Sequence, residues 1–189
     1  MSREIEAEQS QKESDPAGFT IYRGSEAAPY LGSRRRGAAG GNMHPAIQRG
    51  FQLMYESGDS GGASVRVLFS SPDLHVSYVW FKSGFPLPLH SHDVDCLYQI
   101  LAGSVALGTE ELAKGDSVFI PAGVPYTMKP GTDGVEFLEI RTAHDYDTRY
   151  VAKTDAYWDK IAQTRKERAP IWEDEQAPYG LLAGTEPTG

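Results

Sequence analysis

The stretch Gly84-Phe-Pro-Leu-Pro-Leu-His90-Ser-His92-Asp-Val-Asp-Cys96-Leu-Tyr-Gln-Ile-Leu-Ala-Gly103 holds two histidines, one residue apart, between two glycines. Side chains alternate along an extended strand, so His90 and His92 are expected on the same face. Two neutral imidazoles on one face are typical ligands of a transition metal. The stretch therefore predicts a strand that can start a metal site.

Short segments of strand type lie on both sides of this stretch. They combine β-branched and aromatic residues, in several cases with alternation, and are separated by Gly, Pro, Asp and Ser. The predicted strands are residues 50–56, 65–69, 75–81, 96–101, 104–107, 117–120, 126–129 and 135–141, with turns that include 102–103 and 130–134. Many short strands with regular Gly and Pro punctuation predict an all-β sandwich or barrel.

Composition divides the chain into three parts. These are residues 1–42, a flexible acidic start followed by an irregular arm; residues 43–150, the β-barrel; and residues 151–189, a helix and an extended tail. The first 18 residues or so are polar and are expected to be disordered. The helix is expected from Asp155 to Arg168, with Thr154 as its N-cap and Pro170 as its stop.

Bulk properties exclude several classes of partner. The chain of 189 residues has a net charge of −8, which argues against nucleic acid, and the one basic run, Arg34–Arg36, is interpreted as a solvated loop. No apolar run approaches the ~18 residues of a membrane span. Cys96 is the single cysteine, so an internal disulfide is excluded, and the N-terminus lacks the pattern of a signal peptide. A cytoplasmic location is the resulting expectation.

The chain resembles the cupin superfamily, whose members carry two short motifs on a small jelly-roll barrel. The first motif is Gly, five residues, His-x-His, three or four residues, Glu, six residues, Gly. Gly84, His90, His92 and Gly103 match its spacing, with Cys96 where the Glu would be. The resemblance implies an all-β cupin-type double-stranded β-helix, or jelly-roll barrel, with a C-terminal helix added here.

The second cupin motif is also present, with departures. Its frame is Gly, five residues, Pro-x-Gly, two residues, His, three residues, Asn. Gly115, Pro121 and Gly123 match, while Tyr126 stands at the third His position and Pro130 at the Asn position. Cupin metals are usually held by three His and one Glu, so two of the four usual ligands are present by identity.

Each of the four motif positions has a functional and a structural interpretation. His90 and His92 are interpreted as metal ligands, because burying two imidazoles without partners would cost about 1–3 kcal/mol each. Cys96 is either a thiolate ligand or a small buried hydrophobe. Tyr126 could be a phenolate ligand, but a hydrogen-bonding or catalytic role is favoured. The expected cofactor is a divalent metal ion, with iron, zinc, manganese and nickel left open.

Three further residues are candidates for the cavity. Tyr98 shares the parity of Cys96, which predicts a place in a substrate-binding wall or in the core. Glu139 and Arg141 share a face with Phe137. If that face points inward, Glu139 can replace the missing carboxylate as a catalytic residue and Arg141 can hold a substrate carboxylate; otherwise they form a solvated pair.

Other polar side chains are interpreted as structural. Asp95 lies next to Cys96, but alternation turns it to the opposite face. His44, His75 and His144 stand alone, with His75, on a neighbouring strand, the one worth checking.

The resemblance leaves the activity open, because the cupin barrel hosts many chemistries. One hypothesis is a metal-dependent enzyme that acts on a small molecule as a dioxygenase, lyase or isomerase. A minor version resembles the thiol dioxygenases, which place Cys at the Glu position but keep the third His that Tyr126 replaces. The alternative is a metal-free or non-catalytic barrel that binds a small ligand. A homodimer is also expected, with the arm or the Trp158 helix covering an apolar sheet face.

Overall fold

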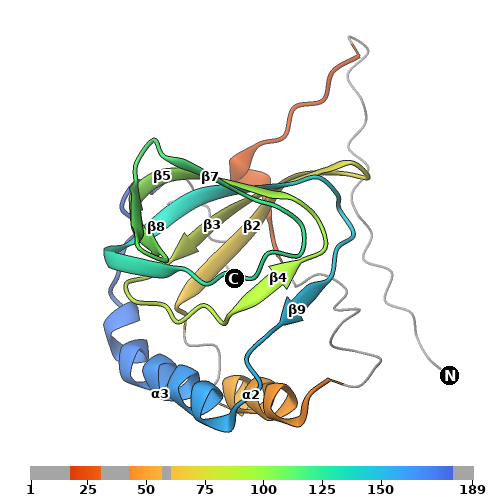
Figure 1. Cartoon of the computed structure of the whole chain (residues 1–189). Coiled ribbons are helices and arrows are strands. Elements are labelled where there is room, and N and C mark those ends of the chain that lie inside the picture. The colour runs from red at the N-terminus through yellow and green to blue at the C-terminus, as the bar shows by residue number, and fades with distance from the viewer. Residues whose placement is uncertain (1–17, 31–42, 57–60, 181–189) are drawn as a thin grey trace, which may run out of the picture.

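The computed structural model describes residues 18–30, 43–56 and 61–180, which form a curled β-sheet with two helices on one side (Figure 1). The elements in order are η1 (Gly24–Glu26), β1 (Ala28–Pro29), α2 (Pro45–Glu56), β2 (Ala63–Ser71), β3 (Leu74–Phe81), β4 (His90–His92), β5 (Cys96–Leu107), β6 (Glu110–Ala113), β7 (Ser117–Ile120), β8 (Lys129–Arg141), β9 (Thr148–Tyr150) and α3 (Asp155–Trp172). The expectations for residues 1–17, for Arg34–Arg36 and for the end of the tail lie outside the described ranges. The predicted fold class, a β-barrel with a C-terminal helix, is confirmed.

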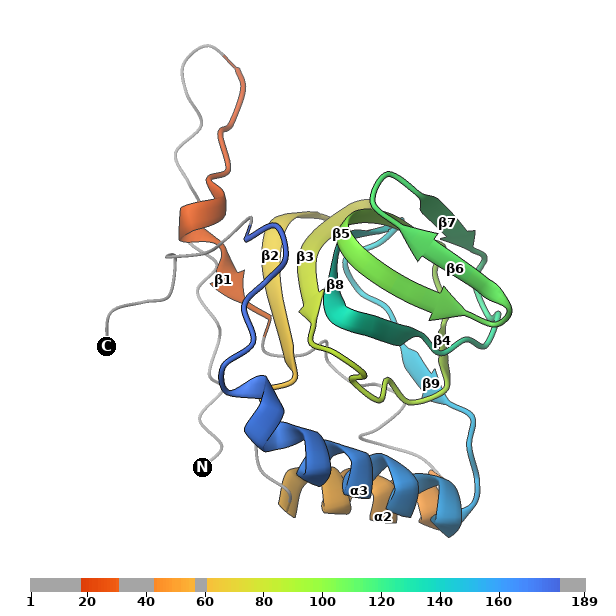
Figure 2. The ribbon, with the colours of Figure 1, turned by 90° about the vertical axis from the view of Figure 1, so that its left-hand side faces the viewer.

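The main sheet has the strand order β1-β2-β3-β8-β5-β6, with every pair antiparallel. The start of β5 pairs with β7 and its end pairs with β6. Strands β4 and β9 form a second small sheet, and a bridge between His90 and Tyr126 ties β4 to the segment before β8. In Figures 1 and 2 the main sheet curls toward β4 and β9, which complete the barrel.

Inward-facing side chains line up in rows across β2, β3, β8 and β5. The polar rows, as we call them, are Ser70–His75–Arg141–Cys96 and Ser77–Glu139–Tyr98. The apolar rows are Val65–Val79–Phe137–Ile100 and Phe81–Val135. The apolar rows form the centre of the main hydrophobic core, where each large buried side chain stabilises the fold by about 1.5–3 kcal/mol. The polar rows continue the same sheet face toward the end of β8.

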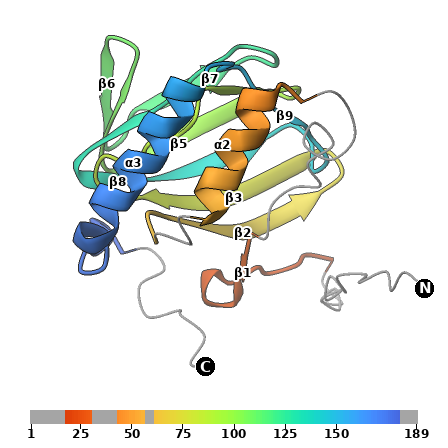
Figure 3. The ribbon, with the colours of Figure 1, turned by 90° about the horizontal axis from the view of Figure 1, so that it is seen from below.

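The two helices lie side by side beneath the barrel (Figure 3). They meet where Gly50 of α2 faces Trp158 of α3, so closely that a Cβ on Gly50 would lie 2.1 Å from the indole. Ala46 and Ile47 complete the buried part of this second core. No helix in the described part of the chain is long and apolar enough to cross a membrane.

The strand predicted at Gly50–Glu56 is wrong, because these residues are the second half of α2. Pro45 occupies the first turn, where its missing N–H is harmless, and Nδ1 of His44 accepts a hydrogen bond from the Ala46 amide at 3.3 Å. Gly50 resembles a turn residue in the sequence, but the structure uses it for helix contact.

The C-terminal helix is longer than predicted. It begins after Thr154, as expected, but continues past Arg168 and through Pro170 to Trp172. Trp172 is fully buried, and its Nε1 donates to the Ser83 carbonyl at 2.9 Å. This anchoring holds the last turn helical despite the proline.

Two predicted turns are absent from the described barrel. Residues 96–107 form one strand and residues 129–141 another, with irregular register near Gly103. Gly103 and Gly134 both have positive φ, and a Cβ on Gly103 would lie 2.1 Å from the Gly134 carbonyl oxygen. The glycines therefore mark bulges rather than chain reversals. The strand predicted at 126–129 reduces to the Tyr126 bridge and the first residue of β8, whereas β6 and β9 were not predicted.

Candidate metal and ligand site

Tyr98, Glu139 and Arg141 of the polar rows line a cavity of about 250 Å³ inside the barrel. Its aromatic and apolar walls come mainly from Val65, Val79, Phe81, Leu87, Met128, Phe137, Tyr146 and Tyr150. Polar groups gather toward one end, where His90, His92, Tyr98, Tyr126, Glu139 and Arg141 line it. The open question about Glu139 and Arg141 is therefore answered: both point inward and are buried.

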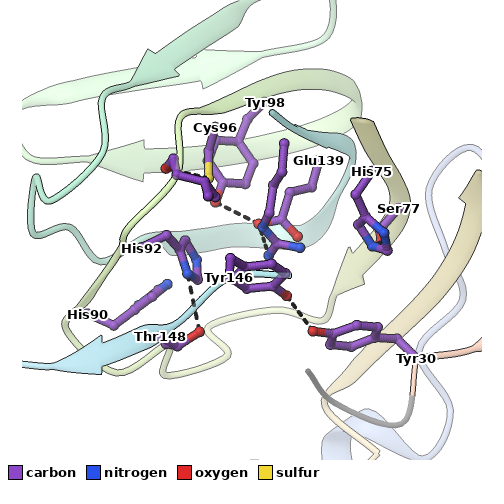
Figure 4. A network of polar contacts seen from close by, with 12 residues as sticks. Tyr30, His75, Ser77, His90, His92, Cys96, Tyr98, Glu139, Tyr146 and Thr148 are labelled. Atoms are coloured by element: carbon purple, nitrogen blue, oxygen red, sulfur yellow. Dashed lines mark hydrogen bonds and ion pairs between the residues drawn. The ribbon is translucent and has the colours of Figure 1, made fainter. Parts of the chain in front are cut away.

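Three potential metal ligands converge from three strands. His92 lies on β4, Cys96 on β5 and Glu139 on β8, and one ligand atom of each lies within 4.8 Å of the others. All three residues are buried. Figure 4 shows their side chains gathered around the same point. This is a buried nitrogen, sulfur and oxygen donor set that could hold a metal ion.

His92 is oriented for this role by its neighbours on β9. Its Nδ1 lies 3.2 Å from the Thr148 hydroxyl, so Nε2 is the nitrogen left for coordination (Figure 4). Burial, assisted by the positive charge of Arg141, lowers the pKa of His92 to about 3. The ring is therefore neutral at neutral pH, which is the form that binds metal.

Cys96 is almost inaccessible and makes a weak contact with the Val94 carbonyl, at 3.8 Å. Burial, and then the negative charge of Glu139, raise the pKa of its thiol to about 11. Without a metal the thiol is protonated and unreactive. A coordinating metal would have to displace this proton.

Glu139 and Arg141 form a buried ion pair, with Nη2 of Arg141 2.5 Å from Oε1 of Glu139. The Tyr98 hydroxyl donates to the same oxygen at 2.8 Å. Burial alone would lower the pKa of Arg141, but the carboxylate outweighs it and the pKa is raised. Because both contacts use Oε1, Oε2 is the oxygen that can turn to a metal without breaking them.

His90 is not a member of the three-residue group, although it lies on the same strand face as His92. Its Nδ1 lies 2.7 Å from the Pro88 carbonyl, which can only accept, so Nδ1 carries the proton. Its Nε2 lies 3.1 Å from the Tyr126 hydroxyl, which in turn contacts the Tyr98 hydroxyl. Burial raises the pKa of Tyr126, which favours the neutral phenol over a phenolate. The ligand and catalytic roles expected for Tyr126 and His90 stay predictions.

Two important cavity residues were missed by sequence reasoning. The Tyr146 ring lies 4.0 Å from the Arg141 guanidinium carbon, and its hydroxyl contacts that of Tyr30 from the N-terminal arm (Figure 4). Thr148 holds His92. Tyr146, Thr148 and Tyr150 all line the cavity, and their spacing of two residues is the signal that could have revealed a strand here.

The donor chemistry of the group fits a transition metal. A thiolate, an imidazole and a carboxylate suit zinc or iron better than a hard cation. Two of the three ligands already have the outer hydrogen bonds that usually orient metal ligands. Arg141 acts against metal binding in two ways. Its positive charge repels a cation, and its guanidinium competes with the metal for the carboxylate of Glu139.

Comparisons with known proteins show the fold. No protein-family model matches the chain, and no curated protein matches it. The polyketide cyclase RemF from Streptomyces resistomycificus is 16% identical with a TM-score of 0.54, over 79% of this chain and 96% of that one. An RmlC-like cupin from Shewanella frigidimarina is 22% identical with a TM-score of 0.42, over 44% of this chain and 79% of that one. A Bacillus subtilis oxalate decarboxylase variant is 15% identical with a TM-score of 0.47, over 70% of this chain and 33% of that one. RemF, the one of these three with a TM-score above 0.5, shares its fold with this chain, and that fold is the cupin-type barrel that the sequence predicted.

Proposed function

We propose that the barrel binds a divalent metal ion through His92, Cys96 and Glu139, and that it binds a small molecule in the adjoining cavity. The observation that carries this proposal is the set of three buried ligand atoms within 4.8 Å of one another. Three protein ligands leave at least one coordination position open, which is the arrangement of catalytic rather than structural sites. The metal would supply a Lewis acid for an oxygen of the bound molecule.

The surrounding residues have distinct roles in this proposal. Thr148 fixes the ring of His92, and Tyr98 fixes the carboxylate of Glu139. His90 stays with Pro88 and Tyr126 as part of the cavity wall. The thiolate donor favours zinc or iron over manganese.

A second candidate is a metal-free barrel that binds a small ligand without turnover. The observation that favours it is the Glu139–Arg141 pair, which balances the charges at the site without a metal. The neutral thiol of Cys96 adds no charge. In this case the same cavity binds its ligand through Arg141 and the tyrosines alone.

Metal content separates the two candidates. The full chain is stripped with a chelator, loaded separately with Zn²⁺, Fe²⁺ or Mn²⁺ under anaerobic conditions, desalted, and analysed by plasma mass spectrometry. We expect about one zinc or iron per chain. His92→Asn and Cys96→Ser are expected to lose most of the metal, because each removes a ligand and leaves two.

Two matched histidine variants sharpen this experiment. His90→Asn tests the neighbour that lies outside the three-residue group, and His44→Asn tests an exposed histidine just before α2, far from the group in the sequence. Both are expected to keep the metal. A wild-type chain that holds far less than one metal would favour the metal-free barrel. A His92→Asn variant with unchanged metal content would instead overturn the site of His92, Cys96 and Glu139.

A further inference from the structure

The guanidinium of Arg141 is the least satisfied polar group at the cavity. Arg141 is 5% exposed, and its Nε is buried with no hydrogen-bond partner among the residues that the structure describes. A buried donor without a partner is destabilising, so an acceptor supplied by a ligand would be favoured here. The acceptor that Nη2 of Arg141 contacts, Oε1 of Glu139, is shared with Tyr98. The arrangement leaves Arg141 able to take a further acceptor from a ligand in the cavity, which it lines.

The charges at the site change when a metal binds. Without metal, the charges of Glu139 and Arg141 cancel. A divalent ion held by His92, Cys96 and Glu139 adds two positive charges, of which a thiolate ligand balances one. The loaded site therefore carries excess positive charge inside the barrel, where an uncompensated charge is costly. An anionic ligand would remove it.

The rest of the cavity favours a flat apolar body. Phe81, Phe137, Tyr126, Tyr146 and Tyr150 supply aromatic walls. The Tyr146 ring already lies against the planar guanidinium of Arg141, at 4.0 Å. A volume of about 250 Å³ exceeds the ~150 Å³ of an engineered cavity that takes benzene, so a single ring with one small substituent fits.

We propose that the cavity binds a small aromatic carboxylate, with the carboxylate on Arg141 and the ring against the aromatic walls, and that this anion and the metal bind cooperatively. The inference rests on the proposed metal site, because the excess positive charge arises only when the metal is present. A carboxylate matches the fork of an arginine, since it can accept two parallel N–H bonds. By linkage, each ligand must raise the affinity for the other by the same factor.

The test uses benzoate and Zn²⁺ as probes in isothermal titration calorimetry on the full chain. We expect benzoate to bind the zinc-loaded protein at least tenfold more tightly than the metal-free protein. Saturating benzoate should raise the affinity for zinc by the same factor. Cyclohexanecarboxylate, which keeps the charge but not the flat ring, and benzyl alcohol, which keeps the ring but not the charge, should both bind at least tenfold more weakly than benzoate.

Two arginine variants test whether the carboxylate of benzoate binds Arg141 or the metal. Arg141→Lys keeps the positive charge but loses the planar fork, so it should retain zinc and lose at least tenfold in benzoate affinity. Arg149→Lys, at an exposed position on β9, should change neither.

The outcomes distinguish this inference from the metal proposal. Stoichiometric zinc with equal benzoate affinity in both forms, or with no benzoate binding at millimolar concentration, would overturn the inference and leave the metal site standing. Unchanged benzoate affinity in Arg141→Lys, or equal affinity for cyclohexanecarboxylate, would also overturn it. Absence of zinc binding would overturn both proposals.

Discussion

The apolar and polar rows of the inner sheet face are equally buried but differ in chemistry. Val79 and Phe137 pair across β3 and β8 in the apolar rows, and are 2% and 1% exposed. Two residues along the same strands, Ser77 pairs with Glu139 in the polar rows, at 0% and 7%. Burial of the first pair stabilises the fold, whereas burial of a carboxylate costs free energy unless it is fully paired. The comparison supports the proposal that the polar rows serve binding rather than stability.

The largest expected effect lies in the apolar rows. Phe137→Ala should lower the free energy of unfolding by about 3–5 kcal/mol, because it removes a ring from the centre of the core. Urea unfolding followed by tryptophan fluorescence measures this change. The folded variant should still bind about one zinc. A loss below 1 kcal/mol, or a loss of zinc from folded protein, would contradict the separate roles of the apolar rows in stability and of the polar rows in metal binding.

In the polar rows, removing both charges of the Glu139–Arg141 pair together should not lower the free energy of unfolding, in contrast to Phe137→Ala in the apolar rows. Glu139→Gln alone or Arg141→Met alone should cost about 3–5 kcal/mol, because each leaves a buried charge unpaired. The double variant Glu139→Leu/Arg141→Met should be as stable as the wild type or gain up to about 4 kcal/mol. The same urea experiment applies. A double variant less stable than either single variant would show that the ion pair stabilises the fold.

Metal binding should release a proton from the polar rows. Burial and Glu139 raise the pKa of Cys96 to about 11, so at pH 7.5 the thiol is protonated until a metal binds. Zinc titrations in buffers of different ionisation enthalpy count the protons released. Cys96→Ser, where it still binds zinc, should release about one proton fewer. Equal proton release by the two proteins would contradict coordination by a thiolate.

The polar rows should also make stability depend on pH in the metal-free protein. Burial, then the charge of Arg141 and the neighbouring His144, lower the pKa of His75 to about 4, against about 6.5 in the unfolded chain. Between these values the unfolded state binds more protons, so the free energy of unfolding should fall as pH falls from 6.5 toward 4.

A glutamine at position 75 isolates this contribution. Urea unfolding of His75→Gln across the same pH range should show a shallower decline, with the remainder due to other buried histidines such as His92. An identical pH profile in both proteins would show that His75 does not contribute to the pH dependence of stability.

The smallest expected effect is at the contact between Tyr30 of the N-terminal arm and Tyr146 of the cavity wall. Tyr30→Phe removes the hydrogen bond between the Tyr30 and Tyr146 hydroxyls and should cost about 0.5–1.5 kcal/mol in stability. Benzoate affinity should fall less than it does in Arg141→Lys, because the Tyr146 ring keeps its contact with Arg141. A larger fall in benzoate affinity than in Arg141→Lys would indicate that the main contact of the anion is not Arg141.

The sequence predicted the barrel and the inward face of His92 and Cys96, because local alternation and motif spacing carry that information. It grouped Glu139 with Phe137 but could not place that face inward, since both faces of β8 carry buried residues. It paired His92 with His90, whereas the structure groups His92 with Cys96 and Glu139. That grouping depends on how three strands meet in space, which no single segment encodes. The strand predicted at residues 50–56 was wrong because the segment was started at Gly50, whereas the helix begins at Pro45 and Gly50 packs against Trp158.

X-ray absorption at the zinc edge of the zinc-loaded protein identifies the atoms bound to the metal. A site of His92, Cys96 and Glu139 should give one sulfur scatterer at about 2.3 Å with nitrogen and oxygen scatterers at about 2.0–2.2 Å, and the sulfur shell should be lost in any zinc retained by Cys96→Ser. A wild-type spectrum with nitrogen and oxygen neighbours and no sulfur would contradict the His92, Cys96 and Glu139 site.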